Sequence, residues 1–197
     1  VVATDVLLAW DFNTATRDSA LGRVSAMAKD AGAQVAAGLF GEVTLTAQTA
    51  GTDFETAWTI DGAVTLPAYV DSPTYPSTHT TTVAKVGFSV PFRIVVSKAA
   101  AATLKAGGTP PVVIMGHGFF GDASELSSGA YRRAAQAAGA VAIGIDWWGL
   151  AKPDIAPLVG GLVAKLNPLI ALVDRLEQGL VNVVAVADDI EERVGRA

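Results

Sequence analysis

The residues best suited to chemistry lie in one short stretch, in which an apolar run leads into a glycine-rich turn. This stretch reads Val112-Val113-Ile114-Met115-Gly116-His117-Gly118-Phe119-Phe120-Gly121. Glycines let a main-chain N–H approach a bound group without a Cβ in the way. N–H groups held in this manner stabilise the negative oxygen that develops during acyl transfer. The pattern therefore predicts a turn that binds an anion or an oxyanion.

The order of apolar strand, His-Gly and glycine turn resembles the α/β-hydrolase superfamily, in particular secreted bacterial lipases and esterases. In that family a His-Gly loop follows the third strand of the sheet. The residue after His-Gly donates its backbone N–H to the oxyanion. The resemblance implies that Phe119 is this donor, and that His117 and Gly118 form the oxyanion loop. For His117 itself, anchoring the loop is favoured over a role as general base.

The following residues extend the resemblance over Pro110 to Leu150. A helix from about Ser127 and a strand leading into Ile145-Asp146-Trp147-Trp148-Gly149 match the family's next helix and fourth strand. The resemblance implies hydrolysis of a small apolar ester through a serine acyl-enzyme, without a cofactor, outside the cell or in its envelope. Substrate contacts are implied for Phe120, Trp147 and Trp148, although the two tryptophans fit a plain core equally well.

The family's nucleophile motif is missing, because no Gly-x-Ser-x-Gly occurs and no histidine follows His117. Ser124, Ser127 and Ser128 lie close to the glycine turn but without the spacing of a nucleophile elbow. We therefore expect an N-terminal portion of a hydrolase that is inactive alone. Its nucleophile and catalytic histidine would come from a missing C-terminal portion or from a second chain.

Two alternatives from other functional classes stay open. The turn from Gly116 to Gly121 also fits Gly-x-Gly-x-x-Gly, and Asp146 follows about 25 positions later, near the roughly 20 positions at which a Rossmann-type nucleotide binder has its acidic residue. However, Phe119 and Phe120 would crowd a pyrophosphate. A non-catalytic binding or interaction module could use the same aromatic-lined loop.

Composition excludes several other classes. Hydrophobic residues make up 51% of the chain and charged residues 17%, which predicts a folded core rather than disorder. The net charge of −5 argues against nucleic-acid binding. There is no cysteine, and two histidines leave little material for a metal site. No apolar run reaches the length of about 18–20 residues that a membrane span needs.

The predicted fold class is α/β, the first half of an α/β-hydrolase sheet preceded by a β-rich N-terminal region. Residues 1–100 would form that region with one helix, and residues 101–197 a truncated hydrolase core. In the first region, alternation predicts strands at 5–12, 43–47 and 86–96, with Pro91 indicating an edge strand or a bulge. A helix is expected over 18–30, ending at Gly32. Asp61-Gly62 predicts a hairpin turn.

In the second region, the apolar runs 112–115 and 141–145 predict parallel strands covered on both faces. A helix over 127–138 would start at a serine cap and end at Gly139. Asn167-Pro168 predicts the start of a long helical segment, which Gly179 would divide in two. The apolar residues expected to form its buried stripe include Leu169, Leu172, Val173, Leu176, Leu180 and Val183.

Overall fold

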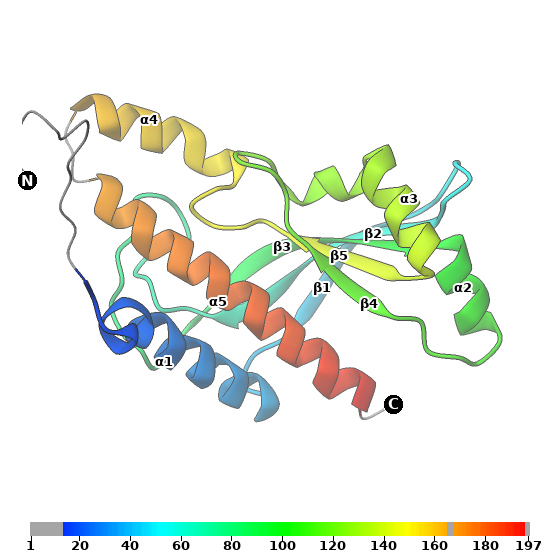
Figure 1. Cartoon of the computed structure of the whole chain (residues 1–197), viewed down its shortest axis with the longest axis horizontal. Helices are drawn as coiled ribbons and strands as arrows, with labels where there is room; N and C mark the ends of the chain where they lie inside the picture. Colours follow the sequence, from blue (N-terminus) through cyan, green and yellow to red (C-terminus); the bar gives the residue numbers. More distant parts are fainter. Residues whose placement is uncertain (1–13, 165–167, 196–197) are drawn as a thin grey trace, which may run out of the picture.

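A five-stranded mixed sheet with helices on both faces forms the centre of the molecule (Figure 1). The computed structural model describes residues 14–164 and 168–195. The strands lie in the order β1-β2-β3-β5-β4, and only β4 and β5 run parallel. Their bounds are Val43–Ala50 (β1), Thr56–Pro67 (β2), Gly87–Ser97 (β3), Val112–Met115 (β4) and Val141–Ile145 (β5). The α/β class is thus confirmed, and strands from both predicted regions share one sheet.

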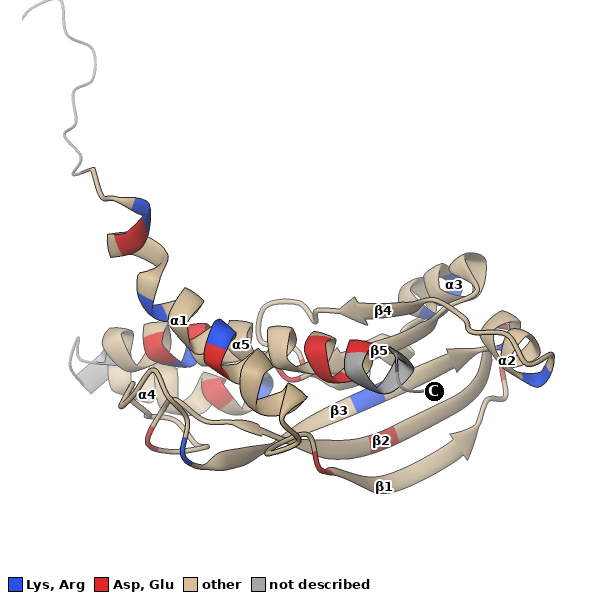
Figure 2. Ribbon diagram, turned by 90° about the horizontal axis from the view of Figure 1, so that it is seen from below, with Lys and Arg blue, Asp and Glu red and all other residues tan. Residues whose placement is uncertain are grey.

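With one exception, the helices pack on the two faces of this sheet. They are α1 (Arg17–Ala36), α2 (Lys98–Lys105), α3 (Gly129–Ala138), α4 (Ile155–Ala164) and α5 (Pro168–Gly195), with short 3₁₀ turns η2 (Ala123–Ser127) and η3 (Lys152–Asp154). The exception is α4, which contacts α5 and η3 instead. Helices α1 and α5 contribute to the main core, which includes Met27, Leu66, Phe92 and Val181. On the other face η2 and α3 bury Leu126 and Ala135 against Val95 and Ala142. Figure 2 shows that charged residues lie mostly on the helices, while the strands are largely uncharged.

Helix α1 begins where the sequence predicts but ends later. The Thr16 hydroxyl caps its start by accepting the Ser19 N–H at 3.1 Å. The expected stop at Gly32 is wrong, because Ala31 and Val35 are buried in the core beside α5 and helical packing continues past the glycine. The chain leaves the helix at Gly38, whose φ of 70° is easily adopted only without a side chain.

The predicted hairpin at Asp61-Gly62 is also wrong, because both residues lie inside the continuous strand β2. Asp61 pairs across the sheet with Arg93, and the two side chains form an ion pair at 2.6 Å. At Gly62 a side chain would come within 2.6 Å of both the Thr44 carbonyl and the Phe92 ring. Gly62 therefore provides room between neighbouring strands, and long-range pairing overrides the local turn preference.

Pro91 does not mark an edge strand, because β3 lies between β2 and β5. Its carbonyl points toward the end of β5 and accepts the Asp146 N–H at 3.4 Å. In an extended strand, the N and C=O of one residue face the same neighbour. The missing Pro91 N–H therefore faces the place where β5 has ended, and no ladder hydrogen bond is lost.

Strands β4 and β5 are parallel, as predicted, but β4 is the outermost strand of the sheet. Val112 and Val113 are 37% and 39% exposed, so the expected cover on both faces is absent. The connecting helix α3 follows Ser128 and ends at Gly139, whose φ is 62°, which confirms the predicted helix limits. The strand predicted at 5–12 and the cap at Asn167 lie outside the described residues.

Helix α5 is continuous through Gly179, contrary to the prediction of two helices. Its buried face is also different from the expected apolar stripe. Asp174, Arg175, Gln178 and Asn182 are buried, whereas Leu169, Val173 and Leu180 are exposed. Asp174, Arg175 and Gln178 bond to other parts of the fold; for example, Gln178 accepts the Tyr69 N–H at 2.7 Å and donates to the Pro67 carbonyl at 3.0 Å. Asn182 accepts a hydrogen bond from Gln178 within the helix at 2.8 Å. Hydrogen bonding therefore acts together with apolar burial, which includes Val181, Ala185 and Val186, in deciding which face of α5 is buried.

Gly179 is required by close packing, and this generates a test with a matched control. A Cβ there would overlap the Trp147 ring and lie 2.8 Å from the Trp148 carbonyl. We expect Gly179→Ala to lower the free energy of unfolding by about 1–3 kcal/mol through overpacking. Gly160→Ala in α4, where nothing lies within 4 Å of the added methyl, should instead raise it by roughly 0.5–1 kcal/mol. Equal effects in urea denaturation would contradict this packing.

Candidate active-site loop

The loop after β4 and the segment after β5 lie side by side and are joined by four hydrogen bonds. We call residues 116–125 the glycine loop and residues 146–152 the β5 exit segment. The bonds are Trp147 N–H to His117 Nε2 (2.8 Å), Phe120 N–H to the Leu150 carbonyl (2.7 Å), Lys152 N–H to the Gly121 carbonyl (2.7 Å) and Ala123 N–H to Asp146 Oδ1 (2.9 Å). Loop backbone groups need such partners where water is excluded. The glycine loop is therefore held at several points along its length.

Further bonds fold the glycine loop on itself. Glu125 accepts the Gly118 N–H at 2.9 Å through Oε2. Its carboxylate also occupies the space that a Cβ at Gly121 would fill, so residue 121 has no room for a side chain. The Gly118 carbonyl lies 2.7 Å from His117 Nδ1 and accepts the Gly121 N–H at 2.9 Å. The loop is thus a closed, internally bonded turn.

Two phenylalanines form the outer part of the glycine loop. Phe120 has a φ of 61°, in the left-handed region that residues with a side chain seldom adopt. Such strain persists only where surrounding contacts enforce it, and it is concentrated at functional sites. The Phe119 ring is 72% exposed and its centroid lies 4.1 Å from that of Phe120. Within residues 14–164 and 168–195, the Phe119 N–H meets no hydrogen-bond acceptor.

Of the site residues predicted from sequence, the structure brings together His117, Gly118, Phe119, Phe120 and Trp147. Trp147 is half-buried over Gly179, and its Nε1 is buried without a hydrogen-bond partner among the described residues. Trp148 is instead 6% exposed and stacks on Phe88, with 6.1 Å between the ring centroids. The Arg175 guanidinium carbon lies 4.7 Å from the centroid of the Trp148 ring. For Trp148 the structure therefore favours the core alternative over a substrate wall.

None of the nearby serines is paired with a histidine base among the described residues. The Ser124 hydroxyl donates to the Asp122 carboxylate, and Ser127 Oγ accepts from Arg93 Nη1 at 3.1 Å. Ser128 occupies the N-cap position of α3. No histidine is hydrogen-bonded to any of these hydroxyls in the part of the chain that the structure describes. The arrangement can bind and polarise a carbonyl, but it lacks an activated nucleophile.

A cavity of about 310 Å³ borders the glycine loop and includes the charged residues Arg93, Asp122, Asp146 and Lys152 in its wall. Burial raises the pKa of Asp146, despite the hydrogen bond from Ala123 that opposes this. Hydrogen bonds from the Ser124 hydroxyl and N–H lower the pKa of Asp122. Among the described residues, no three His, Cys, Asp or Glu side chains are grouped to hold a metal ion.

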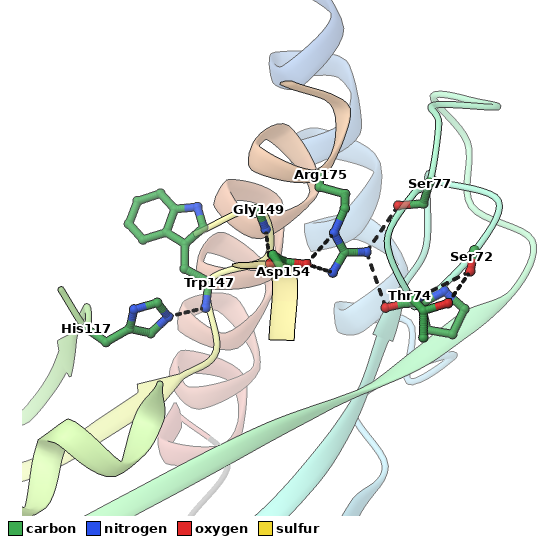
Figure 3. Close-up of polar contacts among 9 residues, drawn as sticks. Ser72, Thr74, Ser77, His117, Trp147, Gly149, Asp154 and Arg175 are labelled. Atoms are coloured by element: carbon green, nitrogen blue, oxygen red, sulfur yellow. Dashed lines mark hydrogen bonds and ion pairs between the residues drawn. The ribbon is translucent and has the colours of Figure 1, made fainter. Parts of the chain in front are cut away.

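A buried ion pair between Asp154 and Arg175 supports the β5 exit segment, and sequence reasoning missed it (Figure 3). Arg175 donates to Asp154 Oδ1 at 2.9 Å through Nε, and through Nη1 to Ser77 Oγ at 3.1 Å and the Pro73 carbonyl at 3.3 Å. Asp154 Oδ2 accepts the Gly149 N–H at 2.7 Å. The pair therefore ties the exit segment, α5 and the loop after β2 together. Its only sequence signal is the helical spacing of polar residues 174, 175, 178 and 182.

Comparison with protein-family models, curated proteins and solved structures gives no match to this chain. No helix among the described residues has the length and apolar character that crossing a bilayer requires. Functional inference therefore rests on the geometry of the loop and on the residues that hold it.

Removal of the buried Asp154 charge should lower the free energy of unfolding far more than removal of the partly exposed Glu177 charge. Asp154→Asn keeps the shape but leaves the buried Arg175 charge unpaired, so we expect unfolding free energy to fall by about 3–5 kcal/mol. Glu177→Gln, in α5, disrupts the partly exposed pair with Arg23 and should cost about 0–1 kcal/mol. Denaturant midpoints measure both; similar losses would refute a special role for the buried pair.

Asp146 and Asp122 should influence stability with opposite signs. A raised native pKa means that folded Asp146 binds more protons than the unfolded chain between the ordinary value of 3.8 and the native one. The contribution of Asp146 to the free energy of unfolding therefore falls as the pH rises from the unfolded pKa to the native pKa. Asp146→Asn, which can still accept the Ala123 N–H, should match or exceed the parent at neutral pH.

Asp122 provides the matched control, because its pKa is lowered. Its stabilising contribution is present above the unfolded value of 3.8 and is lost as pH falls through the native one. Asp122→Asn should therefore lower stability at neutral pH, with the difference shrinking in acid. Urea denaturation of both variants across pH tests this, and a shared sign at neutral pH would show that the two carboxyl environments are misassigned.

Proposed function

We propose that this chain supplies the oxyanion loop of a serine-type hydrolase that acts on small apolar carboxylic esters. The observation that carries the proposal is the unpartnered Phe119 N–H on a strained loop that is bonded to the end of the neighbouring strand. A donor fixed before the reaction stabilises a developing oxyanion without the cost of reorganising. No cofactor takes part in the proposed chemistry.

The proposed reaction proceeds by acyl transfer. A serine hydroxyl attacks the ester carbonyl while a histidine takes its proton, and the carbonyl oxygen becomes the oxyanion of a tetrahedral intermediate. The Phe119 N–H donates to that oxygen, and the residue after the nucleophile supplies the second donor. Both the nucleophile and its base would come from sequence beyond these 197 residues or from another chain, since neither is assembled here.

The open edge of β4 supports this division of labour. Parallel strands end at the same edge of a sheet, so a strand added parallel to β4 would deliver its carboxyl end beside the glycine loop. A cavity of about 480 Å³ borders this edge, with Val112 and Ile114 of β4 facing Ala187 and Ile190 of α5. Its apolar lining suits an additional strand that is buried on both sides.

Apolar surface beside the donor supports the choice of an apolar ester. The exposed Phe119 ring and its neighbour Phe120 border the N–H that would bind the carbonyl oxygen. Burial of an acyl group against such a ring contributes about 25 cal/mol per Å² of apolar area. Trp147, half-buried behind the loop, is proposed to contact substrate only at its edge, and Trp148 is left out.

The nucleotide-binding alternative lacks corresponding support. A dinucleotide-binding turn places pyrophosphate at a helix N-terminus directly after the glycines. Here the glycine loop leads into the short 3₁₀ turn η2, and α3 begins only at Gly129. Asp146 is already bonded to the Ala123 N–H, whereas a nucleotide-binding acid would be directed at ribose.

Loss of the Phe119 N–H should reduce the chemical step in the full-length protein. Phe119→Pro removes this donor and is expected to lower kcat about 10²–10³-fold with a smaller change in KM. Phe119→Ala keeps the N–H but removes the ring, so kcat should be retained while KM for apolar esters rises. A folded Phe119→Pro protein with unchanged kcat would exclude Phe119 as the donor.

A further inference from the structure

The direction of the Phe119 N–H is decided by the carbonyl on the other side of the same peptide bond. The peptide that joins Gly118 to Phe119 is trans, since the one cis bond in the described chain is Tyr75-Pro76. In a trans peptide the C=O and N–H point in opposite directions. Whatever holds the Gly118 carbonyl therefore also aims the Phe119 N–H.

The His117 ring holds that carbonyl, and the hydrogen bonds specify which nitrogen carries the proton. Nε2 lies 2.8 Å from the Trp147 nitrogen, whose N–H can only donate. Nε2 must therefore be the unprotonated acceptor, as Figure 3 illustrates for this contact. The proton of the neutral ring then belongs to Nδ1, 2.7 Å from the Gly118 carbonyl, where it is donated.

We propose that His117, as the neutral Nδ1–H tautomer, is a positioning residue that aims the Phe119 N–H out of the glycine loop. The ring contacts both the Trp147 N–H, just after β5, and the Gly118 carbonyl. It therefore fixes the Gly118–Phe119 peptide, and with it the Phe119 N–H, relative to Trp147. Gly121 N–H shares the carbonyl at 2.9 Å and limits its rotation. The catalytic consequence rests on the proposed function, whereas the tautomer and the peptide orientation do not.

Protonation of His117 would disconnect this arrangement. A proton on Nε2 turns the acceptor into a donor that faces the Trp147 N–H, so the contact breaks. Among the described residues, the charged groups near the ring include Asp122 in the loop and Asp146 in the exit segment, both of which interact with it electrostatically, and Glu125, which is bonded to the adjoining Gly118 N–H. From α3, the Tyr131 hydroxyl donates to the Gly116 carbonyl at 3.2 Å. Only the neutral Nδ1–H ring can therefore make both contacts.

Histidine NMR tests the tautomer directly, because the chain has only two histidines. His79→Gln leaves His117 as the single imidazole. We expect long-range ¹H–¹⁵N spectra at neutral pH to show a protonated Nδ1 and an unprotonated Nε2. An Nε2–H tautomer at neutral pH would overturn the proposal.

Two substitutions separate the two contacts of the ring. Asn at position 117 can place an amide donor near the Nδ1 position, whereas Gln can place an acceptor near Nε2. We expect His117→Asn to keep the Phe119 amide resonance near that of the parent and His117→Gln to shift it. If both variants shift it equally, or neither does, the ring does not orient this peptide.

In the full-length protein the same pair distinguishes positioning from a purely structural role. We expect His117→Gln to lower kcat about 10-fold or more at unchanged KM, and His117→Asn to retain most of kcat. If both variants lose kcat in proportion to their loss of thermal stability, His117 has only a structural role and the positioning hypothesis is rejected. A full-length protein without esterase activity would refute the proposed function, whereas the NMR outcome would still decide how the peptide is held.

Discussion

Backbone hydrogen bonding between two irregular segments is the constraint on which the site depends. Neither the glycine loop nor the β5 exit segment forms a regular ladder, so their polar groups must satisfy one another. They do so through Trp147 and His117, Phe120 and Leu150, and Lys152 and Gly121. The exit segment is held in turn by the bond from Gly149 to Asp154 and by the Asp154–Arg175 pair. The position of one N–H thus depends on α5 as well as on the sheet.

This dependence explains why α5 buries its polar side chains. Desolvation lowers the pKa of Arg175, so burial of this guanidinium is unfavourable by itself. Asp154, Ser77 and the Pro73 carbonyl compensate by accepting hydrogen bonds from it. A buried pair of this kind gives little net stability compared with apolar packing, but its loss from one side is costly. What it provides here is a fixed relation between α5, the exit segment and the loop after β2.

Local patterns predicted most elements, whereas long-range partners decided the rest. The strand β4, the helix ending at Gly139 and the parallel pairing of β5 follow from residues close in sequence. The predictions made from Asp61-Gly62, Pro91 and Gly179 were wrong. A neighbouring strand or Trp147 determines the structure at these positions, and the sequence around them does not reveal those partners. For the site, sequence placed His117, Gly118 and Phe119 on one loop correctly. It could not supply the partners of the loop, since Leu150, Lys152 and Arg175 are ordinary residues until the fold brings them near.

The proposed role of the Phe119 N–H is to bind the oxyanion of an ester-hydrolase intermediate. The most direct measurement is a crystal structure of the full-length protein after reaction with an alkyl fluorophosphonate, whose phosphonyl oxygen imitates that oxyanion. The account predicts phosphonylation of a serine outside these 197 residues, with the phosphonyl oxygen about 2.7–3.1 Å from the Phe119 nitrogen. A phosphonyl oxygen bound by other donors, with the Phe119 N–H directed elsewhere, would contradict it.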